Sequence, residues 1–324
     1  MGSWLKCVVG AAFAATLGSP ALAAEDNYPS RAIELVTHRT AGSTFQGARI
    51  IADALGPLLG VPVVVTPKAA GGGTVAPASV AAAPADGYTL LVANSGSNGT
   101  VPTIMPVAYK SSDFRYVAMY GTQPMTLVVK ADARWRTLQE LVADIKQNPG
   151  KYNYATSSVG AQSHFVMEMF KAAAGGLKIE HVPFRGAPES VTALLGGHVE
   201  VGSTYLADVK GQIDAGQLRI LAVPEEKRLA AYPSVPTFAE SGYPDVVSTA
   251  WFGIAAPAAT PRNVIEKLEA AMRKVVDDPE VKKRLAVIGY TAAYLNSESF
   301  SKYVDAQEVL FTRVAKQASM KMSN

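Results

Sequence analysis

Short apolar strands alternate with helical stretches along most of this chain, and the alternation limits its fold more than any other feature. Near the start, strand-like runs at 33–37, 61–66 and 88–93 are separated by helical patterns at 47–59 and 75–83. The second run is rich in β-branched residues, which favour strands. This β-α-β-α-β order predicts an α/β fold with a parallel sheet covered by helices.

The same alternation returns in the second half of the chain. The expected strands lie at 152–155, 179–183, 199–203 and 219–223, and the expected helices at 163–174, 189–196, 261–277, 279–287 and 299–316. Two stretches rich in β-prone residues next to Gly or Pro, 117–130 and 248–256, are typical of extended connections. We therefore expect two doubly wound lobes joined by two extended crossings. Lobe I would consist of 24–122 and 250–324, and lobe II of 123–249.

The first 23 residues have the pattern of an export signal. Lys6 is the only charge before Glu25, an apolar stretch covers 8–17, and Ala21-Leu22-Ala23 offers small residues for cleavage. The alternative is a membrane anchor, but a span needs about 20 apolar residues. We expect cleavage near Ala23 and a periplasmic location.

Composition excludes several kinds of protein. The net charge is +3 and no Lys/Arg-rich run occurs, which disfavours nucleic-acid binding. The single cysteine, Cys7, rules out an intrachain disulfide and a thiolate metal site. We expect no metal and no cofactor.

Three loops share a design in which a strand ends, a turn rich in small polar residues follows, and a helix begins. They lie at 40–44, 94–100 and 156–163. Backbone N–H groups at a helix N-terminus, together with the helix dipole, suit a carboxylate or phosphate. The alternative is ordinary capping, because Ser, Thr and Asn are the usual N-cap residues.

Two arginines and one phenylalanine stand beside these loops. Arg39 directly follows the first strand, and Arg185 with Gly186 follows the strand at 179–183. A guanidinium can bind a carboxylate through two parallel hydrogen bonds, although either arginine could instead be a solvated surface residue. Phe45 could place its ring against a ligand or could pack against its own helix.

Catalytic patterns are weak. The chain has no Gly-x-Ser-x-Gly motif, and of its four histidines only His164 has an acid, Glu168, at helical i,i+4 spacing. A hydrolase acting on carboxylate esters would need His38 or His164 as the base. We therefore expect a binding protein and keep this hydrolase as an alternative.

Several motifs, in this order, resemble the Bug-type periplasmic solute receptors of tripartite tricarboxylate transporters over essentially the whole chain after the export signal. These motifs are Ala41-Gly42 with Ala48-Arg49, Ala70-Gly71-Gly72-Gly73, Pro84-Ala85-Asp86-Gly87-Tyr88, Ser157-Ser158-x-Gly160, His181-Val182-Pro183-Phe184-Arg185-Gly186, Leu194-Leu195-Gly196-Gly197-His198, Pro233-Ser234-Val235-Pro236-Thr237 and Trp251-Phe252-Gly253.

The resemblance implies a periplasmic binding protein fold of the type II kind, whose two lobes close on a small carboxylate. The loops at 41–44 and 157–160 would bind carboxylate oxygens through backbone N–H groups and bridging waters. The receptor, expected as a monomer, would deliver its ligand to a large and a small membrane subunit. A ligand-sensing subunit of a signalling receptor is the alternative.

Three departures from the family pattern bear on the ligand. Phe45 and Thr204 stand where relatives often have Asp, and Arg39 stands where an aromatic residue is usual. We therefore expect an aromatic mono- or dicarboxylate, such as a terephthalate-like acid, with Phe45 stacked on its ring and Arg39 paired with a carboxylate. The full predicted ligand-binding set is Arg39, Thr40, Ala41, Gly42, Ser43, Thr44, Phe45, Asn94, Ser95, Ser157, Ser158, Val159, Gly160, Ser163, His164, Arg185, Gly186 and Thr204.

Overall fold

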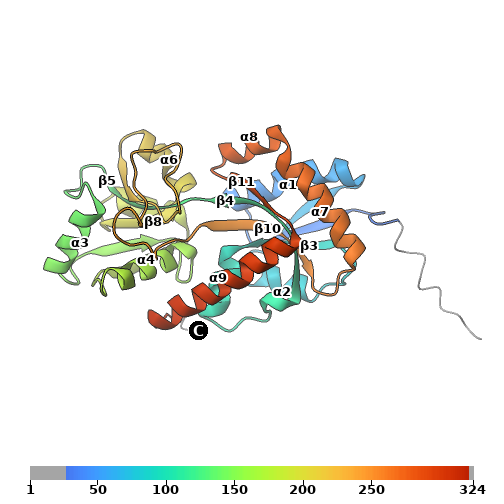
Figure 1. Ribbon diagram of the computed structural model, residues 1–324, viewed down its shortest axis with the longest axis horizontal. Helices are drawn as coiled ribbons and strands as arrows, with labels where there is room; N and C mark the ends of the chain where they lie inside the picture. Colours follow the sequence, from blue (N-terminus) through green and yellow to red (C-terminus); the bar gives the residue numbers. More distant parts are fainter. Residues whose placement is uncertain (1–26, 321–324) are drawn as a thin grey trace, which may run out of the picture.

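The computed structural model describes residues 27–320 and consists of two α/β lobes side by side (Figure 1). The predicted export signal lies outside the described residues. Each lobe is built on its own sheet, as the alternation of strands and helices predicts. None of the helices between residues 27 and 320 is long and apolar enough to span a membrane.

The sheet of lobe I has six strands in the order β11-β4-β10-β3-β1-β2. Strand β1 pairs in parallel with both β2 and β3, whereas β10 runs antiparallel to β3 and β4. The strands are β1 Ile33–Thr37, β2 Val63–Pro67, β3 Thr89–Asn94, β4 Phe114–Gln123, β10 Ala250–Pro257 and β11 Thr291–Leu295.

The sheet of lobe II repeats this arrangement with five strands in the order β7-β6-β8-β5-β9. Strand β6 is parallel to β7 and β8, and β5 is antiparallel to β8 and β9. The strands are β5 Met125–Lys130, β6 Asn153–Thr156, β7 Glu180–Pro183, β8 Val201–Tyr205 and β9 Leu218–Ala222. The parallel strand pairs agree with the predicted parallel sheets, and each sheet also includes a strand that crosses over from the other lobe and runs antiparallel to its neighbours.

The two lobes are joined where these strands cross. Strand β4 of lobe I leads through Pro124 directly into β5 of lobe II, and β10 returns the chain to lobe I. Glu225 ties the two crossings together, because its carboxylate accepts hydrogen bonds from the Met125 N–H (3.4 Å) and from the Thr249 hydroxyl.

Helices cover both sheets and bury their apolar faces. Helix α7, for example, buries Val264, Leu268, Met272 and Val275 at helical spacing. Lobe I carries α1 Gly42–Leu59, α2 Val75–Ala81, α7 Arg262–Asp277 and α8 Pro279–Val287; lobe II carries α3 Leu138–Gln147, α4 Gln162–Ala173, α5 Ala187–Leu195 and α6 Leu206–Asp214.

Helix α9, Ser297–Gln317, packs on both lobes (Figure 1). Near its start, Phe300 packs edge-on against Trp251 of β10 in lobe I, with 5.3 Å between the ring centroids. Three turns further on, Phe311 packs against Phe165 of α4, with 5.5 Å between the centroids. The chain is therefore linked across the lobes by α9 as well as by the two crossings.

Candidate functional site

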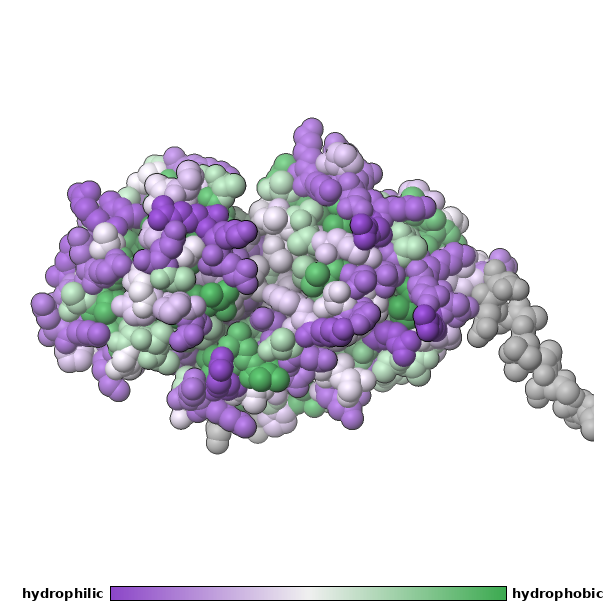
Figure 2. Space-filling view, viewed as in Figure 1, coloured by the Kyte–Doolittle hydropathy of each residue, from purple (hydrophilic) through white to green (hydrophobic). Residues whose placement is uncertain are grey.

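The topology of the sheets places the candidate site between the lobes. In lobe I the chain leaves the neighbouring strands β1 and β3 toward opposite edges of the sheet. In lobe II it does the same after the neighbouring strands β6 and β8. Ligands of open α/β sheets bind at such switch points, outside the carboxyl ends of the strands. Figure 2 shows the surface hollowed between the two lobes.

The loop after β1 leads to a helix start that has no side-chain cap. Ala41 precedes α1 in an extended conformation and lacks an oxygen that could cap the helix, and the first turn contains no acid. Arg39, Thr40, Ala41 and Gly42 are exposed, while Ser43 and Thr44 are half-buried. Gly42 has a φ of 81°, a conformation that glycine adopts without strain. The first N–H groups of α1 are thus open to an anion.

Phe45 lies in this first turn with its side chain half-buried. Within the described part of the chain, it belongs to none of the four buried hydrophobic clusters and to no aromatic pair. The Phe45 ring is therefore not part of a hydrophobic core, and it is available to contact a ligand.

The loop after β3 is used differently. The Asn94 carboxamide caps the short helix Ser95–Thr100 by accepting from the N–H groups of Gly96 (2.9 Å) and Ser97 (3.0 Å). Ser95 donates its hydroxyl hydrogen to the Gln162 side chain, and Thr100 donates to the Gly160 carbonyl over 2.8 Å. Both acceptors belong to lobe II, so this loop holds the two lobes together, while the buried side-chain amide nitrogen of Asn98 has no hydrogen-bond partner among residues 27–320.

The loop after β6 offers a second helix start without a side-chain cap. Ala161 precedes α4 and lacks a capping oxygen, and Gly160 turns the chain with a φ of 74°. The Ser163 side chain is buried and its hydroxyl has no hydrogen-bond partner among residues 27–320. Such a buried hydroxyl needs a partner from outside the described chain. Ser157, Ser158 and Val159 are half-buried beside it.

His164 supports this loop from inside lobe II. Its Nδ1 accepts a hydrogen bond from the Gly160 N–H (3.2 Å), and its ring stacks on His181 with 3.9 Å between centroids. Burial, together with the charge of Lys171, lowers the pKa of His164 to about 4. A neutral ring engaged in this way positions the loop and is not placed to act as a base.

The loop after β8 contains an acid that the sequence analysis did not single out. Thr204, buried at the end of β8, donates its hydroxyl hydrogen to Asp208 Oδ2 over 3.1 Å. Asp208 lies in the first turn of α6, and burial raises its pKa even though Thr204 and the positive charge of Arg39 act in the opposite direction. An Asp in the first turn of a helix after a strand was the available signal.

Arg185 and Gly186 lie in the loop after β7, directly before α5. The Arg185 side chain is exposed, its backbone N–H donates to Glu189 (3.1 Å), and Gly186 is half-buried. Its guanidinium makes no ion pair within the described residues. Over the same residues, no group of three or more His, Cys, Asp or Glu side chains is arranged to hold a metal ion.

Two α/β lobes, each with its own sheet and joined by two crossing strands, have the architecture of two-lobed solute receptors. The family model described as tripartite tricarboxylate transporter family receptor matches residues 47–319, and the chain belongs to this family. Members are solute-binding proteins of the periplasm, not enzymes, and this chain is a solute-binding receptor.

Three similar proteins illustrate the relationship. BugT of Bordetella pertussis is 35% identical over 291 residues, which is 89% of each chain. A Rhodopseudomonas palustris protein solved with adipate is 28% identical, with a TM-score of 0.81 over 91% of this chain and 99% of that one. MatC from the same species, with bound malate, is 26% identical, with a TM-score of 0.77 over 89% and 99%.

Proposed function

We propose that the protein captures a small organic carboxylate between its lobes and releases it to a transporter in the membrane. The observation that carries this proposal is the pair of uncapped helix starts, α1 in lobe I and α4 in lobe II. Their backbone N–H groups and helix dipoles suit carboxylate oxygens. Adipate and malate, bound by two similar proteins, are both carboxylates.

The body of the ligand is, in our proposal, an aromatic ring with one or two carboxylates. Phe45 supports this because its half-buried ring lies in the same turn as the open N–H groups. Arg39 adds a positive charge next to that turn, where a guanidinium can pair with a carboxylate.

Export and delivery complete the proposal. We propose a signal cleaved near Ala23, a monomeric receptor with lobe I at 24–122 and 250–324 and lobe II at 123–249, and a large and a small membrane subunit as partners. Ligand contacts from both lobes favour the closed arrangement. Small-angle scattering should therefore record a smaller radius of gyration at saturating ligand.

Native mass spectrometry of the purified protein tests the function most directly. We expect an added mass of a small organic acid that is lost on denaturation. Thermal-shift screening against terephthalate, benzoate, adipate and malate should then give a melting temperature that rises with ligand concentration. The acid should be recovered unchanged, and a panel without any shift would contradict the proposal. Methyl esters of the same acids should also stay intact; their hydrolysis to acid and methanol would support the ester-hydrolase alternative.

A further inference from the structure

Asp208 is a carboxylate without an ion pair at the proposed ligand site. Its Oδ2 accepts a hydrogen bond from the Thr204 hydroxyl, and the Tyr205 backbone N–H also favours its ionised form. The residues described by the structure place no Lys, Arg or His nitrogen within ion-pair distance of it. Thr204 itself is fixed by the sheet, because its carbonyl accepts from the Thr126 hydroxyl (3.1 Å). The carboxylate is therefore held in place and keeps acceptor capacity that no protein donor fills.

The start of α6, where Asp208 lies, abuts lobe I. A Cβ atom added to Gly289, in the turn between α8 and β11, would stand 2.3 Å from the Cβ of Ala207. The Tyr205 side chain packs against the hydrophobic cores of both lobes. Because Tyr205 and Ala207 lie just before Asp208 in the chain, this acid belongs to the junction between the lobes.

Lobe I brings a positive and a polar group to the same junction. The charge of Arg39 acts on both Asp208 and Tyr205. The Tyr290 hydroxyl is buried beside the Thr44 and Tyr120 side chains, and its ring stacks on Tyr120 with 6.0 Å between the ring centroids. It would lie 3.2 Å from a Cβ on Gly47, which places it against α1.

We propose that Asp208 makes this receptor selective for carboxylates that carry a hydroxyl group at the end remote from the carboxylate bound by lobe I, over ligands with a second ionised carboxylate there. The inference rests on the proposed function. An ionised carboxylate can only accept hydrogen bonds, so it binds a hydroxyl hydrogen and repels a second carboxylate.

The competing interpretation is an electrostatic latch in which Arg39 and Asp208 attract each other across the cleft. In that case any anion must displace the attraction, and removing the charge of Asp208 would strengthen the binding of all carboxylates equally. The two interpretations therefore differ in whether the effect depends on the remote group of the ligand.

Isothermal titration of 4-hydroxybenzoate and terephthalate, which differ only at that remote position, tests the inference. We expect the wild type to prefer 4-hydroxybenzoate. Asp208→Asn should weaken 4-hydroxybenzoate about tenfold and tighten terephthalate by a similar factor, since a hydrogen bond to a charged acceptor is lost and a repulsion is removed. The matched control is Asp214→Asn on the same helix, an exposed acid paired with Lys210, which should change neither affinity.

The outcomes separate the two proposals. Equal tightening of both acids by Asp208→Asn, or no change in either, overturns the role of Asp208 but leaves the receptor function intact. If neither aromatic acid binds, 4-hydroxybutanoate and succinate form the corresponding pair, and Asp208→Asn should abolish the preference for 4-hydroxybutanoate. A folded protein that binds none of the four acids would overturn both proposals.

Discussion

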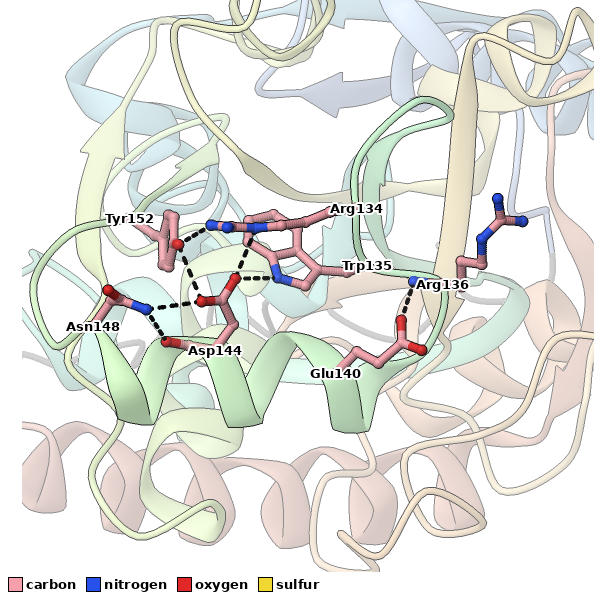
Figure 3. A network of polar contacts seen from close by, with 7 residues as sticks. All are labelled: Arg134, Trp135, Arg136, Glu140, Asp144, Asn148 and Tyr152. Carbon is pink, nitrogen blue, oxygen red and sulfur yellow. Dashed lines mark hydrogen bonds and ion pairs between the residues drawn. The ribbon is translucent and has the colours of Figure 1, made fainter.

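Two aspartates of lobe II show opposite uses of a carboxylate. Asp144 on α3 accepts from the Trp135 indole (2.7 Å), the Asn148 amide (2.9 Å) and the Tyr152 hydroxyl (3.2 Å), and pairs with Arg134 at 2.8 Å (Figure 3). Asp208 on α6 accepts from the Thr204 hydroxyl and forms no ion pair within residues 27–320. The first acid is surrounded by donors of its own lobe, and the second faces the junction between lobes.

The pKa values follow this difference. Burial raises the pKa of Asp144, but the Trp135 hydrogen bond and the Arg134 charge outweigh it, so the net pKa is lowered. For Asp208 burial prevails and the pKa is raised. A lowered pKa means that ionised Asp144 stabilises the fold, whereas ionised Asp208 costs stability. Groups retained at such a cost are common at functional sites.

Removing Asp144 should have the largest effect on stability. We expect Asp144→Ala to lower the free energy of unfolding by about 2–3 kcal/mol, because a charged acceptor is lost and the Trp135 donor loses its partner. Urea unfolding at pH 7 measures the change. Asp208→Ala is the matched comparison and should cost less than about 1 kcal/mol. Equal losses in the two variants would remove the distinction between the two acids.

Much of the fold was predictable from the sequence because strands and helices have distinct apolar periods. The expected strand at 33–37 coincides with β1, and the expected helix at 279–287 with α8. Helix α1 begins at Gly42, five residues before its apolar pattern, because its first turn faces the cleft and carries little apolar surface. Helix α3 was overlooked although Thr137 and Glu140 form a capping box that the sequence displays.

The candidate site was harder to predict because hydrogen-bond partners come from distant parts of the chain. The sequence treats the loops at 94–100 and 156–163 alike, yet Asn94 caps its own loop while Ser163 has a hydroxyl without a partner in the described chain. Asp208 was missed because α6 has a mixed, weakly periodic sequence and was not expected as a helix. Only the tertiary arrangement brings this acid near Arg39.

Glu225, which bridges the two crossings, accepts several hydrogen bonds as Asp144 does but has a raised pKa as Asp208 does. Burial raises its pKa to about 7 even though its carboxylate accepts hydrogen bonds from Thr249 and Met125. Because the folded pKa exceeds the unfolded value of about 4.3, the free energy of unfolding should fall as the pH rises from about 4.5 through 7. Glu225→Gln should remove this fall, which is on the order of 2 kcal/mol.

Urea unfolding of the wild type and Glu225→Gln at pH 5 and pH 8 checks this. The control is Glu189→Gln, an exposed acid of α5 that should leave the pH dependence unchanged. The same slope in wild type and Glu225→Gln would show that the carboxylate is not buried in its neutral form at the crossings.

Two arginines extend the comparison from stability to binding. Arg39→Ala should weaken the carboxylate found by the screen about tenfold, equivalent to about 1.4 kcal/mol, and leave the unfolding midpoint unchanged. Arg134→Ala removes the ion pair of Asp144 and should lower the midpoint without changing affinity. Isothermal titration and urea unfolding of both variants measure the two effects. An affinity within about twofold of wild type for Arg39→Ala would exclude its assigned role.

The smallest effect gives the sharpest contrast, because one substitution should act in opposite directions at the two aspartates. At pH 7 without ligand, Asp208→Asn should raise the free energy of unfolding slightly, since it removes an ionised group whose folded pKa lies above its unfolded value. Asp144→Asn should lower the free energy of unfolding, because ionised Asp144 stabilises the fold above its unfolded pKa. This stabilisation disappears as the pH falls through the folded pKa of Asp144. Both differences from wild type should shrink in acid, as the carboxyl groups become neutral like the amides that replace them. Urea unfolding between pH 3 and pH 7 follows both series, and a loss of stability in Asp208→Asn would mean that its carboxylate contributes to the fold as Asp144 does.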